Sequence, residues 1–120
     1  MSESQEINVV AIHYPKPDKV QEFRALVLRV KNTFANHPGK LHHHAFGTKT
    51  GEEIVVIERF KDQASLDQIL ATEEFKEIAE LVLALVRQPP TLINGAPLPG
   101  FEAYGNEKGV AEFLVDSHWV

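Results

Sequence analysis

Cysteine is absent from this chain of 120 residues, so the sequence excludes disulfides, thiolate nucleophiles and cysteine-based metal sites. No apolar run approaches the roughly 20 residues that a membrane-spanning helix needs. The chain has 12 basic and 17 acidic residues, and its basic residues form no block. Both observations argue against nucleic acid and anionic membranes as partners. The polar start, residues 1–6, lacks the features of a signal peptide, so we expect a cytoplasmic protein.

Sequence motifs of several common enzyme classes are also missing. No G-x-S-x-G elbow surrounds a serine, and no glycine-rich loop of the phosphate-binding kind occurs. These absences disfavour serine hydrolases and nucleotide-dependent enzymes. They direct attention to histidine, of which the chain has six residues.

Three consecutive histidines, His42, His43 and His44, are the most informative feature present. They lie in Lys40–Thr48, a segment that is otherwise typical of a β-strand. Because strand side chains alternate between faces, His42 and His44 point one way and His43 the other. Imidazoles titrate near neutral pH, so one of these residues, or His13, is a candidate general acid or base. A packed or hydrogen-bonded structural role is the alternative for each.

The hydrophobic pattern predicts alternating strands and helices in a single domain. Proline and glycine residues separate the segments, and Pro89-Pro90 is expected to end the last helix. Asp62 and Thr72 are expected to cap the starts of two helices. The predicted elements are a strand at Ile7–Tyr14, a helix at Asp18–Asn36, a strand at Lys40–Thr48, a strand at Glu53–Phe60, a short helix from Asp62 to Leu70, a helix from Thr72, and a strand at Thr91–Ala96.

This order of elements is that of the α+β ferredoxin-like fold, whose helices cover one face of a four-stranded antiparallel sheet. The strands at Ile7–Tyr14 and Glu53–Phe60 are largely apolar on both alternating faces. A second copy of the same sheet is the simplest cover for the other face, so we expect a homodimer. The expected domain spans residues 1–104, and residues 105–120 form a C-terminal extension.

Metal binding is a further possibility for the histidines. His42 and His44 share a face, and His13 or Glu58 would have to complete a two-histidine, one-carboxylate site. The spacing is not that of H-E-x-x-H or a similar helix motif, so we expect no metal site. Glu58 is alternatively a buried acid or a salt-bridged residue, and Arg59, its neighbour in a regular strand, is not its partner. Asn94 is a candidate for orienting a ligand.

Several segments together resemble the antibiotic biosynthesis monooxygenase-like family of dimeric α+β barrel proteins. They are Tyr14–Lys19 before a helix, Pro38-Gly39, Ile54–Asp62, Ala64–Leu70, Phe75-Lys76 and Pro89-Pro90, and the likeness covers residues 7 to 101. The resemblance implies two sheets that form a dimeric barrel and a pocket between each sheet and its helices. It implies activities that range from oxygenation of aromatic polyketides without metal or flavin to haem degradation and isomerisation.

Departures from the family pattern refine this expectation. His43 and His44 stand where members often carry tyrosine and glutamate, and Ile69 and Ala79 lie near the positions of the tryptophan and histidine of haem-degrading members. The family register places His43 on the helix-side face with Val56 and Glu58, so His43 is the first choice for the proton-transferring residue. The other candidate catalytic residues are His44, His42, His13 and Glu58, and the candidate substrate contacts are Tyr14, Val56, Phe60, Leu66 and Asn94.

Two classes of function follow from these expectations. The first is a cofactor-independent enzyme that oxygenates, cyclises, dehydrates or isomerises an aromatic or polyketide-like molecule with histidine as acid or base. The second is a dimeric barrel protein that binds a small ligand, or serves in a stress response, without turnover. For the enzyme, the face that carries His42 and His44, joined by His13, is an alternative location of the chemistry.

Overall fold

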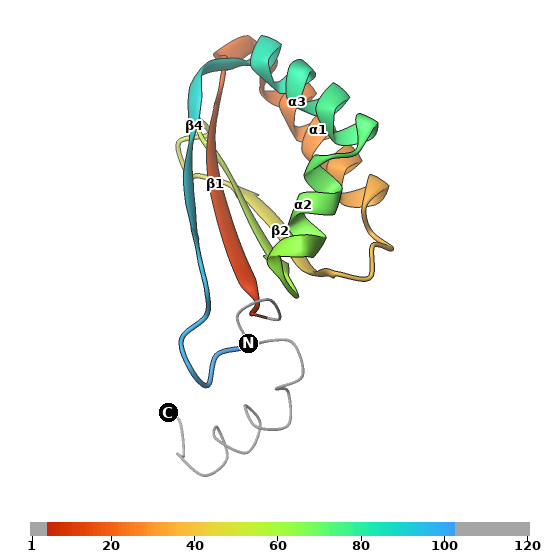
Figure 1. Ribbon diagram of the computed structural model, residues 1–120. Helices are drawn as coiled ribbons and strands as arrows, with labels where there is room; N and C mark the ends of the chain where they lie inside the picture. Colours follow the sequence, from red (N-terminus) through yellow and green to blue (C-terminus); the bar gives the residue numbers. More distant parts are fainter. Residues whose placement is uncertain (1–4, 103–120) are drawn as a thin grey trace.

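The computed structural model describes residues 5–102 and contains a four-stranded sheet with helices on one face (Figure 1). The predicted extension at 105–120 lies outside the described residues. The elements are β1 (Ile7–Pro15), the 3₁₀ turn η2 (Pro17–Lys19), α1 (Val20–Thr33), β2 (Lys40–Gly47), β3 (Ile54–Phe60), α2 (Gln63–Leu70), α3 (Glu73–Leu85) and β4 (Val86–Gly95). None of the described helices is both long enough and apolar enough to cross a membrane.

The sheet has the order β2-β3-β1-β4, and every neighbouring pair is antiparallel. This topology confirms the predicted ferredoxin-like α+β fold. It places β2, the strand of the three histidines, at one edge of the sheet and β4 at the other. The helices α1, α2 and α3 all lie on the same side of the sheet in Figure 1, so its second face is free of helices.

Two helix starts form where the sequence predicted them. The Asp62 carboxylate accepts a hydrogen bond from the Ser65 backbone N–H at 2.8 Å, and the Thr72 hydroxyl accepts one from Phe75 N–H at 3.1 Å. Each cap satisfies an N–H group that has no partner within the helix. The β2–β3 turn contains Gly51 at a φ of 77°, a conformation that favours glycine.

Two predicted elements have wrong boundaries. The first helix is shorter at both ends than the predicted Asp18–Asn36, since η2 precedes it and a turn follows Thr33. The last strand begins at Val86, directly after α3, rather than at Thr91, so Pro89-Pro90 lies within β4 and does not end the helix. Proline is tolerated there because β4 is an edge strand, which needs backbone donors on one side only.

The hydrophobic core lies between the sheet and the helices in two adjoining clusters. One contains Phe23 with Ile54 and Val56, and the other contains Phe60 with Phe34 and Ile69. Phe23 and Phe60 are each only 1% exposed, and burial of such a side chain contributes about 1.5–3 kcal/mol. The core therefore fixes α1 against the middle of the sheet and sets the frame for the polar groups described next.

Candidate functional site

The register of β2 separates the three histidines between the two faces of the sheet. His43 lies opposite Glu58 on the helix side, whereas His42 and His44 lie opposite Arg59 and Ile57 on the helix-free side. An irregularity between Lys40 and His42 shifts the register by one residue. Because of this shift, Lys40 lies on the same side as His43, although regular alternation from His42 would place it on the other face.

A buried ion pair lies beside His43. The Lys40 ammonium is 3.1 Å from the Glu58 carboxylate, and the same carboxylate oxygen is 3.7 Å from Nδ1 of His43. The side chains of Lys40 and His43 are 5% and 7% exposed, and that of Glu58 is 22% exposed. Among the described residues, neither ring nitrogen of His43 has a hydrogen-bond partner. A buried imidazole with two unpaired nitrogens is unusual in a purely structural role.

Burial is the largest influence on His43, and it lowers the pKa of the imidazole below its ordinary value of 6.5. The neighbouring carboxylate of Glu58 opposes this shift, while the positive charges of Lys40 and Lys31, and His42, lower the pKa further. His43 is therefore neutral at pH 7, with a ring nitrogen available to accept a proton. This is the protonation state that a general base requires.

His13 lies on the same face of the sheet as His43. Its ring packs against Phe23 of α1 with 5.0 Å between ring centroids, and its Nδ1 is buried without a hydrogen-bond partner in the described residues. Burial lowers the pKa of His13, and the charge of Glu58 partly opposes the effect. The predicted grouping of His13 with His42 and His44 is wrong, because a strand residue facing α1 cannot share their face.

A cavity of about 340 Å³ opens between α1 and the free edge of β2, and His43 is part of its wall. Its volume falls in the range of small-molecule sites in proteins. The lining residues are Arg24, Val27, Leu28 and Lys31 from α1, His43, His44, Ala45, Phe46 and Gly47 from β2, and Ile54 from β3.

The residues predicted to contact substrate do not line this cavity. Val56 and Phe60 belong to the buried core, and Leu66 packs against the core cluster of Phe60. Asn94 is an exposed residue of β4 that pairs with Val9, away from β2. The role of these four residues as ligand contacts stays a prediction. It would require a ligand to reach parts of the protein outside this cavity.

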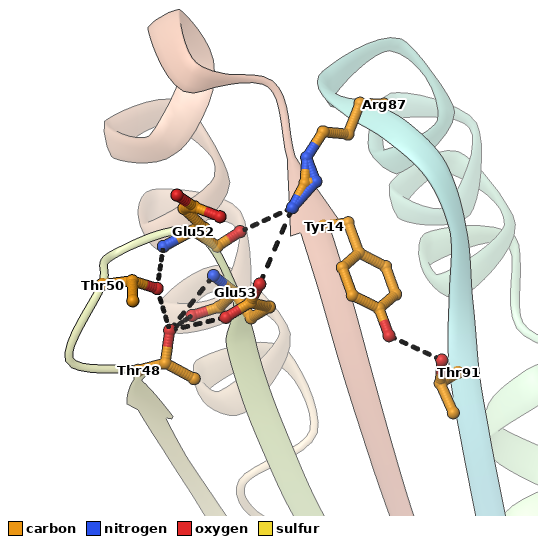
Figure 2. A network of polar contacts seen from close by, with 7 residues as sticks. All are labelled: Tyr14, Thr48, Thr50, Glu52, Glu53, Arg87 and Thr91. Carbon is orange, nitrogen blue, oxygen red and sulfur yellow. Dashed lines mark hydrogen bonds and ion pairs between the residues drawn. The ribbon is translucent and has the colours of Figure 1, made fainter.

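Tyr14 lies on the helix-free face, at the end of the sheet near the β2–β3 turn (Figure 2). Its hydroxyl shares a hydrogen bond of 2.7 Å with Thr91, and the guanidinium of Arg87 lies 5.3 Å from its ring centroid. Arg87 in turn pairs with Glu53 at 3.8 Å and donates to the backbone of Glu52. This network fixes the turn to β1 and β4, so Tyr14 is held on the face opposite to His43.

Sequence reasoning missed the α1 side of the cavity and the participation of Lys40. The spacing of Arg24, Val27, Leu28 and Lys31 at i, i+3, i+4 and i+7 is a signal for one helical stripe, and it lies beside the core stripe. The position of Lys40 had no comparable signal, because it depends on the irregularity in β2.

No group of three or more histidine, cysteine, aspartate or glutamate side chains is placed to hold a metal ion within residues 5–102. The combinations of His42 and His44 with His13 or Glu58 that the sequence left as a possibility do not form, because those two residues lie on the opposite face. The Glu58 carboxylate is instead occupied by the Lys40 ammonium. Arg59, as expected, does not pair with Glu58; it contacts Asn8 at 3.0 Å and Glu6 at 3.5 Å.

These features define a class: a ferredoxin-like α+β protein with a cavity between its helices and the edge of its sheet, and a neutral histidine in the cavity wall. The model of the antibiotic biosynthesis monooxygenase family matches residues 7–81, more than half of the chain, and the protein belongs to this family. The match confirms the resemblance found in the sequence. Family membership indicates a monooxygenase-like function on a small molecule.

Solved structures share this fold. Rv0793 from Mycobacterium tuberculosis is 24% identical with a TM-score of 0.75, over 82% of this chain and 98% of its own. A conserved protein from Methanosarcina mazei Go1 is 27% identical with a TM-score of 0.72, over 78% and 94% of the two chains. A structure described as an antibiotic biosynthesis monooxygenase is 26% identical with a TM-score of 0.72, over 78% and 99%. No curated protein matches the chain.

Proposed function

We propose that this protein is a cofactor-independent enzyme that removes a proton from an aromatic or polyketide-like small molecule, with His43 as the general base. The observation that carries the proposal is the state of His43, which is buried, neutral and free of hydrogen bonds to described residues at the wall of a cavity. Those properties together suit a base that acts near neutral pH.

The groups behind His43 support this role. When His43 takes a proton, the new imidazolium has the Glu58 carboxylate 3.7 Å away, which stabilises the charge. The Lys40 ammonium contacts the same carboxylate oxygen at 3.1 Å and keeps the cluster from carrying a net negative charge. We therefore assign His43 as the catalytic residue, and Glu58 and Lys40 as positioning residues. His42, His44 and His13 are not required for the proton transfer in this scheme.

Oxygenation of an anthrone is the reaction that fits the family best. His43 would remove a proton from the methylene carbon between the rings, which leaves a carbanion delocalised over both aromatic rings. The carbanion reduces dioxygen and forms a carbon–oxygen bond, and the proton held by His43 passes to the terminal oxygen to give a hydroperoxide. The second methylene proton then leaves as the O–O bond breaks, so one oxygen atom becomes the new quinone carbonyl and the other departs as water. The net reaction, anthrone plus dioxygen to anthraquinone plus water, balances without a separate reductant.

We further propose that the working form is a homodimer in which the helix-free faces of two sheets pack together. This face carries Val10, Ile12, Val55 and Ile57 in its centre, and Phe46 at its edge is 46% exposed. None of the described elements covers it (Figure 1). Burial of several such side chains, at about 1.5–3 kcal/mol each, favours a second copy of the same sheet.

The test of the proposed chemistry uses 1,8-dihydroxyanthrone as substrate, with oxygen consumption and quinone absorbance as readouts above the uncatalysed rate. Replacement of His43→Gln should reduce kcat by about 10²–10⁴-fold, the usual loss for a positioned base. The variant His42→Gln, which changes a residue of the other face outside the cavity lining, is the matched control and should keep most of the activity. Loss in this control with an active His43→Gln would move the chemistry to the helix-free face. Binding of the anthrone without turnover would favour the ligand-binding alternative.

A further inference from the structure

The cavity beside His43 has a charge balance opposite to that of the whole chain. The chain has 17 acidic and 12 basic residues, yet none of the described residues that line the cavity is acidic. Two of them, Arg24 and Lys31, are cations. An acidic protein that gathers only positive charge at one cavity offers a complementary site for an anion.

The two cations lie on one stripe of α1, with Val27 and Leu28 between them. Seven residues of helix separate them by about 10 Å along the axis, a distance that two long side chains can span to reach one bound molecule. Arg24 and Lys31 are both exposed, and neither forms an ion pair or hydrogen bond with a described residue. Other cations of this region are already paired, since Lys19 contacts Glu22 and Arg29 contacts Glu77.

Arg24 and Lys31 both line the cavity, one toward each end of the α1 stripe. Nη2 of Arg24 lies so close to Gly47 that a Cβ on that glycine would be 3.5 Å away, so the guanidinium reaches across from α1 to the end of β2. Toward the other end of the stripe, the charge of Lys31 acts on His43 and lowers its pKa. The apolar surface between them comes from Val27, Leu28, Ala45 and Phe46.

We propose that the cavity binds a ligand with a flat apolar body and a carboxylate, and that Arg24 and Lys31 hold the carboxylate while the body packs against the apolar stripe of α1. This inference rests on the site of the proposed function and predicts that the site prefers acidic aromatic molecules to neutral ones such as 1,8-dihydroxyanthrone. A volume of about 340 Å³ accommodates a body of two or three fused rings. A carboxylate gripped at the mouth would orient the rings toward His43.

Equilibrium binding of a matched pair of probes tests the charge requirement without any turnover. The probes are 2-naphthoate and its neutral analogue 2-naphthamide, measured by isothermal titration calorimetry with the full-length protein. We expect 2-naphthoate to bind about tenfold more tightly, since charge-assisted contacts contribute more than neutral ones. The His43 Cε1–H resonance, assigned with His43→Gln, should shift on addition of 2-naphthoate.

Charge-removing variants locate the contact. Arg24→Gln and Lys31→Gln should each reduce the preference for 2-naphthoate several-fold, and the double variant should abolish it. Lys76→Gln on α3 removes the same charge elsewhere and should leave the preference intact. Added salt should weaken binding of 2-naphthoate but not of 2-naphthamide in the wild-type protein, which requires no variant.

Equal affinity for the two probes, an unchanged preference in the double variant, or failure of both probes to bind at millimolar concentration would each overturn the proposal. Failure of the proposed catalysis would look different. In that case 2-naphthoate binds as described and moves the His43 resonance, but His43→Gln leaves the rate of anthrone oxidation unchanged.

Discussion

The two faces of the sheet belong to the same strands and both carry apolar side chains, but they differ in what their polar groups contact. On the helix side, the side chains of Lys40, His43 and Glu58 are largely enclosed and contact one another. On the helix-free side, His42 and His44 stand beside Phe46, with 6.2 Å and 6.1 Å between successive ring centroids, and no described element covers them. Burial by α1, rather than the mere presence of a histidine, therefore makes His43 a candidate base.

The largest expected effect comes from placing a lysine at either of two adjacent residues of β3 that lie on opposite faces of the sheet. Val56 is 8% exposed in the core, and Val56→Lys should unfold the protein, since a buried unpaired charge costs several kcal/mol of a total of about 5–15. Ile57→Lys places the same charge on the opposite face and should give a folded monomer. Circular dichroism and light scattering measure the two outcomes. A wild-type monomer at micromolar concentration, or a dimeric Ile57→Lys protein, would refute the proposed assembly.

The next effect compares a buried ion pair with an exposed one. Lys40→Met leaves the Glu58 carboxylate without its cation in a largely enclosed site, and should lower the free energy of unfolding by about 2 kcal/mol. Lys19→Met breaks the exposed pair with Glu22 and should change it by less than about 0.5 kcal/mol. Urea denaturation measures both values. The double variant Lys40→Met/Glu58→Gln should recover most of the loss, and no recovery would contradict the assigned pairing.

The sequence predicts those features of the structure that neighbouring residues determine, and it predicts poorly those that depend on how distant segments pack together. The strand order, both helix caps and the position of His43 follow from local residue patterns and from the family resemblance, and the structure agrees with them. The start of β4 was predicted wrongly because Pro89-Pro90 favours an interruption locally, whereas an edge strand tolerates it. Pairing of Lys40 with Glu58 depends on a one-residue irregularity that no pattern in the sequence marks.

The cavity shows the same limit. The family resemblance makes Val56, Phe60 and Leu66 candidate substrate contacts, but Val56 and Phe60 lie in the buried core and Leu66 packs against it. The walls come instead from α1, whose exposed stripe contains residues of ordinary surface type. Sequence periodicity identifies which residues share a face, but not which gap between two elements stays open.

A smaller effect follows from the lowered pKa values of His13 and His43. Both imidazoles bind a proton less readily in the folded protein than in the unfolded chain. Their contribution to the free energy of unfolding is therefore fully present above pH 6.5 and is lost as the pH falls through their folded pKa values. Each unit of lowering corresponds to about 1.4 kcal/mol. The melting temperature should fall below pH 6.5, before most carboxylates protonate, and less steeply in His13→Gln/His43→Gln. A fall of equal steepness in that variant would assign the effect to other groups.

The smallest effect tests the charges around His43 directly. Glu58 raises and Lys40 lowers the pKa of His43, so Glu58→Gln should lower that pKa further and Lys40→Met should raise it. Titration of the His43 Cε1–H resonance by NMR measures both shifts, and Lys76→Met is the control for a change in net charge. The acidic limb of the pH–rate profile should move in the same two directions, because the base must be neutral to act. The absence of a shift in both variants would show that burial alone sets the pKa of His43, and shifts of the same sign would contradict the opposite effects assigned to Glu58 and Lys40.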